Sequence, residues 1–334
     1  MGNRQWVLAS HAQGAVNESL WRLVEADVLK PASGQILVKT LWLSVDPYMR
    51  GKLNAGAGMQ VGGLMQGGGV GEVVESNHPG WKVGDIAESP DVGWQEYAVL
   101  TPDLPGASKV NKVDTRTAPP QAALSWLGMP GLTAYFAMLD VGRPKPGDTV
   151  VVSAAAGAVG QIAGQLARLA GCRVIGIAGS DRKLDWCKTI GFDETINYKT
   201  ASDLAAEVGR CGPGGVNVFF DGTGGPIHDA VMKNLATGAR VAIVGRVAVA
   251  NNPGGEDIGL RASSRLIATR AVVQGFVVYD WWNRRDEALQ RLAAWHASGE
   301  LQFREDIMIG LENVPRAFMR MMEGENFGKQ LVQL

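Results

Sequence analysis

The stretch VVVSAAAGAVGQIAGQLARLAG, from Val150 to Gly171, constrains the fold more than any other part of this chain. A run of β-branched residues gives way to small ones, and apolar residues then recur at helical spacing at Ile162, Leu166 and Leu169. The order of strand, tight turn and helix is typical of a nucleotide-binding βαβ unit. Strand and helix patterns continue to alternate up to the run AVVQGFVV, so we predict six parallel strands with helices on both faces.

The first part of the chain has a different pattern. Short β-branched runs such as GQILVKTLWLSV and GGGVGEVVES are separated by Gly, Pro and Asp, which indicates a mostly β domain of barrel or sandwich type. The C-terminal run GKQLVQL also has a strand pattern, and we expect it to return to this β domain. The chain is therefore predicted to be an α/β protein with one domain at residues 1–122 and 300–334 and a doubly wound domain at 123–299.

Composition limits the kinds of partner. The 334 residues include 32 basic and 33 acidic side chains, and this balance favours a small-molecule partner over nucleic acid. No apolar run approaches the ~20 residues that cross a bilayer, and the polar first residues do not form a secretion signal. We expect a soluble cytoplasmic protein that binds neither membranes nor nucleic acid.

Metal-ligand spacing is missing from the sequence. Three cysteines and four histidines are scattered along the chain without a Cys-x-x-Cys or His-x-x-x-His pair. We therefore predict no metal site, and we expect the thiols of Cys172, Cys187 and Cys211 to be reduced and partly buried.

The turn after the first strand departs from the dinucleotide pattern G-x-G-x-x-G at one position. Ala155 stands at the first position, which makes the turn, and Gly157 and Gly160 follow. The second glycine lets the backbone approach a pyrophosphate, and the third lets the helix pack on the strand. We expect a pyrophosphate to bind the backbone N–H groups around Ala158, Val159 and Gly160.

The end of the second strand, RVIGIA, distinguishes NADPH from NADH. Gly179 and Ser180 stand where an NAD-binding protein carries the carboxylate that holds the ribose hydroxyls. Ser180 can donate to a 2′-phosphate and Lys183 can neutralise it, so we predict NADPH. Two alternatives stay open: Asp181 either repels a phosphate or caps the following helix, and Lys183 can be a solvated surface charge.

Five stretches together carry a family resemblance. They are LSVDPYMRG, GMPGLTAYFAML, KPGDTVVVSAAAGAVGQIAGQLARLAG, INYK and GENFGKQLVQL. With them the chain resembles the zinc-independent medium-chain reductases, in the branch of leukotriene and prostaglandin reductases, curcumin reductase and plant alkenal reductases. The resemblance implies a GroES-like β domain with a Rossmann domain, a homodimer, and NADPH between the domains. It also implies reduction of the carbon–carbon double bond of small apolar α,β-unsaturated aldehydes and ketones.

The resemblance further implies which residues contact the cofactor. The 2′-phosphate contacts fall on Ser180, Lys183 and Tyr198, and the phosphate turn runs from Ala155 to Gly160. Contacts on the nicotinamide side fall on seven residues: Met129, Thr133, Val244, Phe276, Val277, Val278 and Asn326.

One departure from the family concerns the proton donor. The family commonly has Tyr-Asn after its fifth Rossmann strand, and this tyrosine is proposed to bind the substrate carbonyl or to supply the proton. Ala250 and Asn251 stand there in this chain, and alanine cannot donate. We therefore predict that Tyr48, in DPYMR, takes this catalytic role, with Tyr279, in VVYDWW, as the second candidate.

Several alternatives remain at this point. The DPYMR segment could be a rigid turn in which Tyr48 is packed and Arg50 pairs with Asp46. Trp281 and Trp282 could form a lid over the substrate or part of a dimer contact. The functional alternatives are a quinone reductase, an alcohol dehydrogenase, against which the lack of a zinc pattern counts, and a non-catalytic NADPH-binding protein.

Overall fold

A six-stranded parallel sheet forms one half of the protein. The computed structural model describes residues 2–251 and 257–334. The strand order across this sheet is β10 (Glu194–Asn197), β9 (Arg173–Ala178), β8 (Thr149–Ser153), β11 (Val216–Asp221), β12 (Leu235–Ile243) and β13 (Val272–Gly275). Numbered along the chain, this order is 3-2-1-4-5-6, the order of a doubly wound dinucleotide-binding fold. The prediction from the alternating pattern is confirmed.

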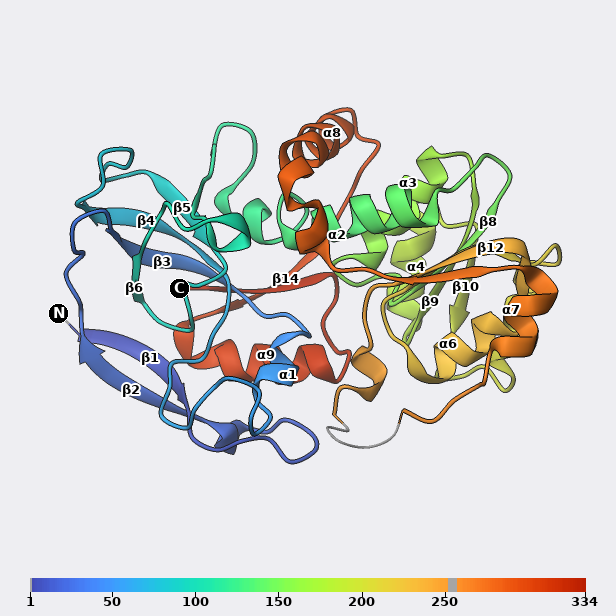
Figure 1. Cartoon of the computed structure of the whole chain (residues 1–334), viewed down its shortest axis with the longest axis horizontal. Coiled ribbons are helices and arrows are strands. Elements are labelled where there is room, and N and C mark those ends of the chain that lie inside the picture. The colour runs from blue at the N-terminus through green and yellow to red at the C-terminus, as the bar shows by residue number, and fades with distance from the viewer. Residues whose placement is uncertain (1, 252–256) are drawn as a thin grey trace.

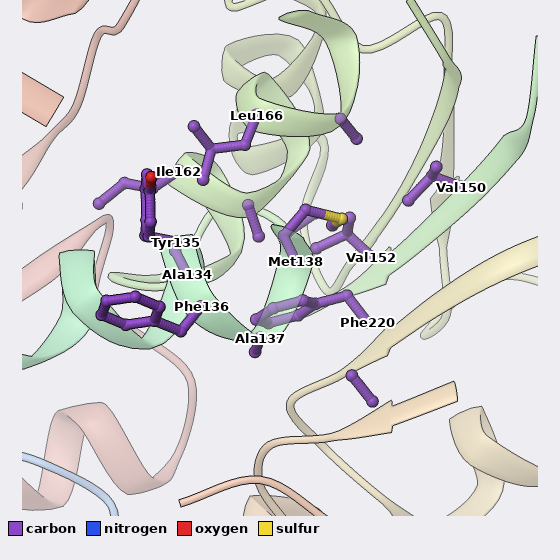
Figure 2. Close-up of a cluster of buried hydrophobic side chains, with 14 of the residues drawn as sticks. Ala134, Tyr135, Phe136, Ala137, Met138, Val150, Val152, Ile162, Leu166 and Phe220 are labelled. Carbon is purple, nitrogen blue, oxygen red and sulfur yellow. The ribbon is translucent and has the colours of Figure 1, made fainter. Parts of the chain in front are cut away.

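Alternation along β8 explains why both faces of this sheet are covered. Val150 and Val152 point to one side, where they pack with Phe220 and with helices α2 (Met129–Phe136) and α3 (Gly160–Leu169), as Figure 2 shows. Val151 points to the other side and packs with residues of α5 (Leu204–Cys211) and α6 (Gly225–Met232). Helices α4 (Asp181–Thr189) and α7 (Ser263–Thr269) complete the layers, and α8 (Arg285–Ala297) packs on α2 (Figure 1).

A seven-stranded sheet forms the other half. Its order is β14 (Glu305–Ile309), β15 (Lys329–Gln333), β3 (Ile36–Ser44), β4 (Gly69–Ser76), β5 (Ile86–Ser89) and β7 (Asn111–Lys112), with β6 (Tyr97–Leu100) paired to β3. The C-terminal strand β15 pairs with β3, antiparallel to it, and so returns to the β domain as expected. Figure 1 shows this sheet beside helices α1 (Met49–Lys52) and α9 (Val314–Met322).

Two local features differ from the sequence expectation. A hairpin of β1 (Gly2–Leu8) and β2 (Trp21–Asp27) precedes the β sheet and was not anticipated. The helical run after Pro119 is broken into a 3₁₀ turn at Pro120–Leu124 and helix α2. The backbone passes so closely here that glycine is required, because a Cβ at Gly128 would lie 2.0 Å from the Ala123 carbonyl oxygen.

Two other expectations concern the thiols and the membrane. Cys172, Cys187 and Cys211 are free thiols, and all three are buried. Within residues 2–251 and 257–334, each helix is too short or too polar to span a bilayer.

Candidate active site

The turn between β8 and α3 has the backbone shape that a phosphate needs. Ala154 adopts a left-handed conformation with φ 48°, and this reverses the chain directly after β8. A Cβ at Gly160 would lie 2.3 Å from the Ala154 carbonyl oxygen, so only glycine fits there. The methyl group of Ala155 is fully buried in the core, which explains why alanine is accepted at the first position of the pattern.

The backbone N–H groups beyond this turn are available to bind an anion. No backbone hydrogen bond occupies the N–H of Ala158 or Val159 within the described part of the chain. Both residues precede the first turn of α3, where the helix dipole favours negative charge. The turn is also held from outside, because the Gly328 N–H donates to the Ala156 carbonyl at 3.1 Å. Asn326 lies beside it and donates to the Gly328 carbonyl at 2.8 Å.

The predicted 2′-phosphate residues meet at the end of β9. The ring of Tyr198 packs on Gly179, where a Cβ would lie 2.8 Å from the ring. Ser180 is the N-cap residue of α4, and its hydroxyl makes no capping bond. The ammonium of Lys183 donates to the Gly324 carbonyl at 2.7 Å. Desolvation and the nearby charge of Lys199 lower the pKa of Lys183, and an anion bound here would relieve that repulsion.

Asp181 is not the N-cap of α4, which corrects one of the two alternatives considered for it. Ser180 is the cap, and Asp181 lies in the first turn of the helix. Its Oδ1 accepts a hydrogen bond from the Asn197 side chain at 2.9 Å. Lys199, two residues further along, is a cation that sequence reasoning missed, because nothing in INYK separates it from an ordinary surface lysine.

Six of the seven residues predicted for the nicotinamide side divide into two groups. Val244 and Phe276 follow β12 and β13, at the same carboxyl edge of the sheet as the turn after β8. Phe276 and Val278 are buried, while Val277 is 56% exposed. Met129 and Thr133 lie in α2, which packs on α3.

Trp281 is partly buried and packs against the hydrophobic core, as Trp282 does. Its ring stacks on Phe276 with a centroid separation of 4.6 Å, and its Nε1 donates to Asp140 at 2.9 Å. The lid and dimer-contact roles of this aromatic pair stay predictions. Trp282 is half-buried, and the centroid of its ring lies 5.7 Å from that of Tyr279.

The two candidate tyrosines lie within electrostatic reach of each other. Tyr48 is 42% exposed and Tyr279 is 48% exposed. Desolvation by the surrounding protein and the charges of Asp46 and Tyr279 raise the pKa of Tyr48 well above its usual range. Desolvation and the charge of Asp46 likewise raise the pKa of Tyr279. Both phenols therefore stay protonated at neutral pH and can donate a hydrogen bond.

Arg50 does not pair with Asp46, contrary to the alternative drawn from the DPYMR segment. The Arg50 side chain is fully buried, and its Nε donates to Asn251 Oδ1 at 3.1 Å. Its other donors reach Asn54 and the Gly14 carbonyl, both at 2.6 Å. The segment in which the family commonly has a tyrosine is thereby held beside the turn that carries Tyr48.

A buried carboxylate at the end of β11 was missed from the sequence. Asp221 accepts hydrogen bonds from the N–H groups of Thr223 and Gly224, and its Oδ2 lies 2.8 Å from His228 Nδ1. Burial alone would raise the pKa of Asp221, but these bonds outweigh it and hold the pKa below its usual range. The bond to Asp221 raises the pKa of His228. The pair shapes the turn beside β8, where doubly wound folds bind their ligand.

This pair predicts a pH dependence of stability. Because the folded pKa of His228 is raised, its contribution is complete below the ordinary pKa of 6.5 and is lost as pH rises through the folded value. Because the folded pKa of Asp221 is lowered, its contribution is lost on the acid side, below 3.8. Between about pH 4 and pH 6.5, His228→Asn should lower the free energy of unfolding by about 2 kcal/mol, and at alkaline pH by less. Urea unfolding measures this difference. His78→Asn, which removes a bond to the exposed Asp103, serves as the control. A pH-independent loss in His228→Asn would contradict the assignment.

The described residues hold no cluster of three or more His, Cys, Asp or Glu side chains that could bind a metal ion.

Comparisons with known proteins place this chain in a family. Residues 4–110 match the family model described as the N-terminal domain of oxidoreductase, and residues 158–294 match the one described as zinc-binding dehydrogenase. The chain is 38% identical to the NADPH-dependent curcumin reductase of Escherichia coli (strain K12), over 99% of this chain and 97% of that protein. It is 35% identical to the NADP(+)-dependent 2-alkenal reductase of Nicotiana tabacum, over 100% and 98%.

A solved structure extends these matches to the whole fold. The complex of CurA from Vibrio vulnificus with NADPH matches with a TM-score of 0.91 and 38% identity, covering 99% of this chain and 98% of that one. The expected fold class and cofactor are confirmed. The chain belongs to the zinc-independent medium-chain reductases and is an NADPH-dependent oxidoreductase.

Proposed function

We propose that this enzyme reduces the carbon–carbon double bond of α,β-unsaturated aldehydes and ketones. When bound, NADPH supplies the hydride. Addition to the β-carbon moves negative charge onto the carbonyl oxygen, so the protein must place a hydrogen-bond donor there. The observation that carries the proposal is the contact between Arg50 and Asn251, which puts the Tyr48 turn beside the segment where a family tyrosine is absent.

Tyr48 is proposed as the donor to that oxygen, with Tyr279 as the second candidate. The hydroxyl of Tyr48 is attached to a turn anchored by the buried Arg50, and its raised pKa keeps it protonated. The relatives named as a curcumin reductase and as a 2-alkenal reductase support a double-bond substrate of this chemistry.

A substrate panel tests the reaction. NADPH oxidation is followed with a 2-alkenal, an enone, a quinone and a saturated aldehyde, and product analysis identifies the bond reduced. We expect turnover with the alkenal and the enone, yielding saturated carbonyl products. Turnover confined to the quinone or to the saturated aldehyde would refute the proposal.

The cofactor assignments predict a switch in preference at Lys183. Removing the ammonium in Lys183→Ala should weaken NADPH binding about tenfold and leave NADH binding unchanged, because only NADPH carries the 2′-phosphate. Lys188→Ala, in the last turn of the same helix, is the matched control. The ratio of the two dissociation constants is measured by titration of tryptophan fluorescence. An unchanged ratio in Lys183→Ala would remove Lys183 from the phosphate site.

We also propose a homodimer formed through the edge strand β13. This strand ends the six-stranded sheet, and all four of its residues are exposed. Ile267, Val272 and Val273 add exposed aliphatic surface there, so a second copy paired on this edge would extend the sheet around a two-fold axis. Val272→Lys should yield monomers in sedimentation experiments, and Val83→Lys, on another exposed valine, should not. A wild-type monomer would refute the dimer.

We also propose the domain boundaries: a GroES-like domain at 1–122 and 300–334, and a cofactor domain at 123–299. The three buried free thiols support a reducing compartment such as the cytoplasm.

A further inference from the structure

Lys329, the first residue of β15, takes part in a buried ion pair at the junction of the two sheets. Its side chain is 2% exposed, and its ammonium lies 2.8 Å from Asp46 Oδ1. The same ammonium donates to the Val45 carbonyl at 2.7 Å. The second oxygen of Asp46 accepts a hydrogen bond from the Ser44 hydroxyl at 2.5 Å. Both charges therefore have close partners in a place that water does not reach.

The neighbours of this pair in the chain belong to the proposed active site. Gly328, directly before Lys329, donates its N–H to Ala156 and bridges Gly157 in the phosphate turn. Asp46 is followed by Pro47 and then by Tyr48, and proline restricts the backbone between them. The ion pair thus links the turn proposed to bind the pyrophosphate to the turn that carries the proposed donor.

The strand beside β15 makes a similar connection. Glu305 of β14 lies opposite Lys329, and its carboxylate accepts a hydrogen bond from the Ser125 hydroxyl at 2.5 Å. Ser125 lies four residues before Met129, which was assigned to the nicotinamide side. The strand pair β14–β15 is therefore bonded to three segments that must be mutually aligned for hydride transfer.

We propose that Lys329 and Asp46 are positioning residues, whose ion pair holds the hydroxyl of Tyr48 in register with the bound cofactor. The inference rests on the proposed function, because it assigns Tyr48 as the donor. Stability alone explains the pair poorly, since an apolar pair of similar shape in a buried place is often as stable as an ion pair. Alignment is a stronger reason, because a displacement of about 1 Å can cost about 100-fold in rate.

The test replaces both charges together. Lys329→Met alone would leave a buried carboxylate without a partner and risk unfolding, so it is combined with Asp46→Asn. We expect the double variant to fold, to bind NADPH within about threefold of the wild type, and to lose about 10- to 100-fold in kcat. If it does not fold, Lys329→Arg, which keeps both charges and changes the geometry of the pair, should show a smaller loss of kcat.

A second background separates positioning from general damage. In the Tyr48→Phe enzyme there is no hydroxyl left to position, so adding the double replacement should cause little further loss of kcat. An equal further loss in that background would overturn the inference. A control removes another ion pair, Arg240–Asp148, whose charged atoms lie 2.6 Å apart before the start of β8, at the end away from the phosphate turn. The double variant Arg240→Met with Asp148→Asn should leave kcat unchanged.

The remaining outcomes distinguish this inference from the proposed function. If Tyr48→Phe is impaired and the folded double variant keeps the wild-type kcat, the positioning role is wrong and the donor assignment stands. If Tyr48→Phe itself is fully active, the donor assignment is wrong and the positioning role falls with it.

Discussion

Replacing Gly160→Ala is expected to raise the Kd for NADPH by about 100-fold. The added Cβ would lie 2.3 Å from the carbonyl oxygen of Ala154, 2.9 Å from its carbon and 3.0 Å from the Cα of Ala155. All three are backbone atoms, so the clash can be relieved only by moving the turn away from α3. Overpacking of this kind costs about 1–3 kcal/mol, and here the strain falls on the N–H groups proposed to bind the pyrophosphate.

Titration of intrinsic fluorescence with NADPH measures this effect. Gly214→Ala is the matched control, because a Cβ at Gly214 has no neighbour within 4 Å. Thermal unfolding of both variants checks that the fold survives. A folded Gly160→Ala protein that binds NADPH as tightly as the wild type would show that the turn is not the phosphate site.

The second large effect is expected for Tyr48→Phe, with a fall of about 100-fold in kcat and an unchanged Kd for NADPH. The substitution removes only the hydroxyl and keeps the ring beside the Lys52 ammonium, 5.3 Å away. Loss of one general acid or oxyanion donor costs about 10²-fold or more. Single-turnover measurements with an enone separate this step from product release.

The pH profile provides an independent check on Tyr48. A donor must be protonated, and desolvation together with the charge of Asp46 raises the pKa of Tyr48 above its ordinary 10.0. The wild-type kcat should therefore show no loss from ionisation of this group up to about pH 10. Tyr279→Phe is the comparator and should lower kcat less. Full activity in Tyr48→Phe with a large loss in Tyr279→Phe would transfer the role to Tyr279.

The cofactor half of the site was readable from local sequence. The turn from Ala155 to Gly160 and Ser180 at the start of α4 each occupy a position that spacing along the chain sets, whereas Tyr198 was predicted only from the family resemblance. Local reasoning works there because a strand, a glycine turn and a helix N-terminus are contiguous elements.

The reaction half of the site was less accessible to such reasoning. Nothing near DPYMR indicates that Arg50 bonds to Asn251 rather than to Asp46, or that Asp46 pairs with Lys329. The aromatic residues of VVYDWW gave no sign that Trp281 stacks on Phe276 while Tyr279 stays 48% exposed. Each outcome depends on how the two sheets pack against each other.

The chain's own residues were therefore enough to establish the parallel sheet, the glycine turn and the preference for NADPH, because periodicity, glycine conformation and charge act over a few neighbouring residues. The tertiary structure alone decided the partners of Arg50 and Asp46. Those contacts join residues 201 and 283 positions apart, and a buried charge takes whichever partner the packing of the two halves brings within reach.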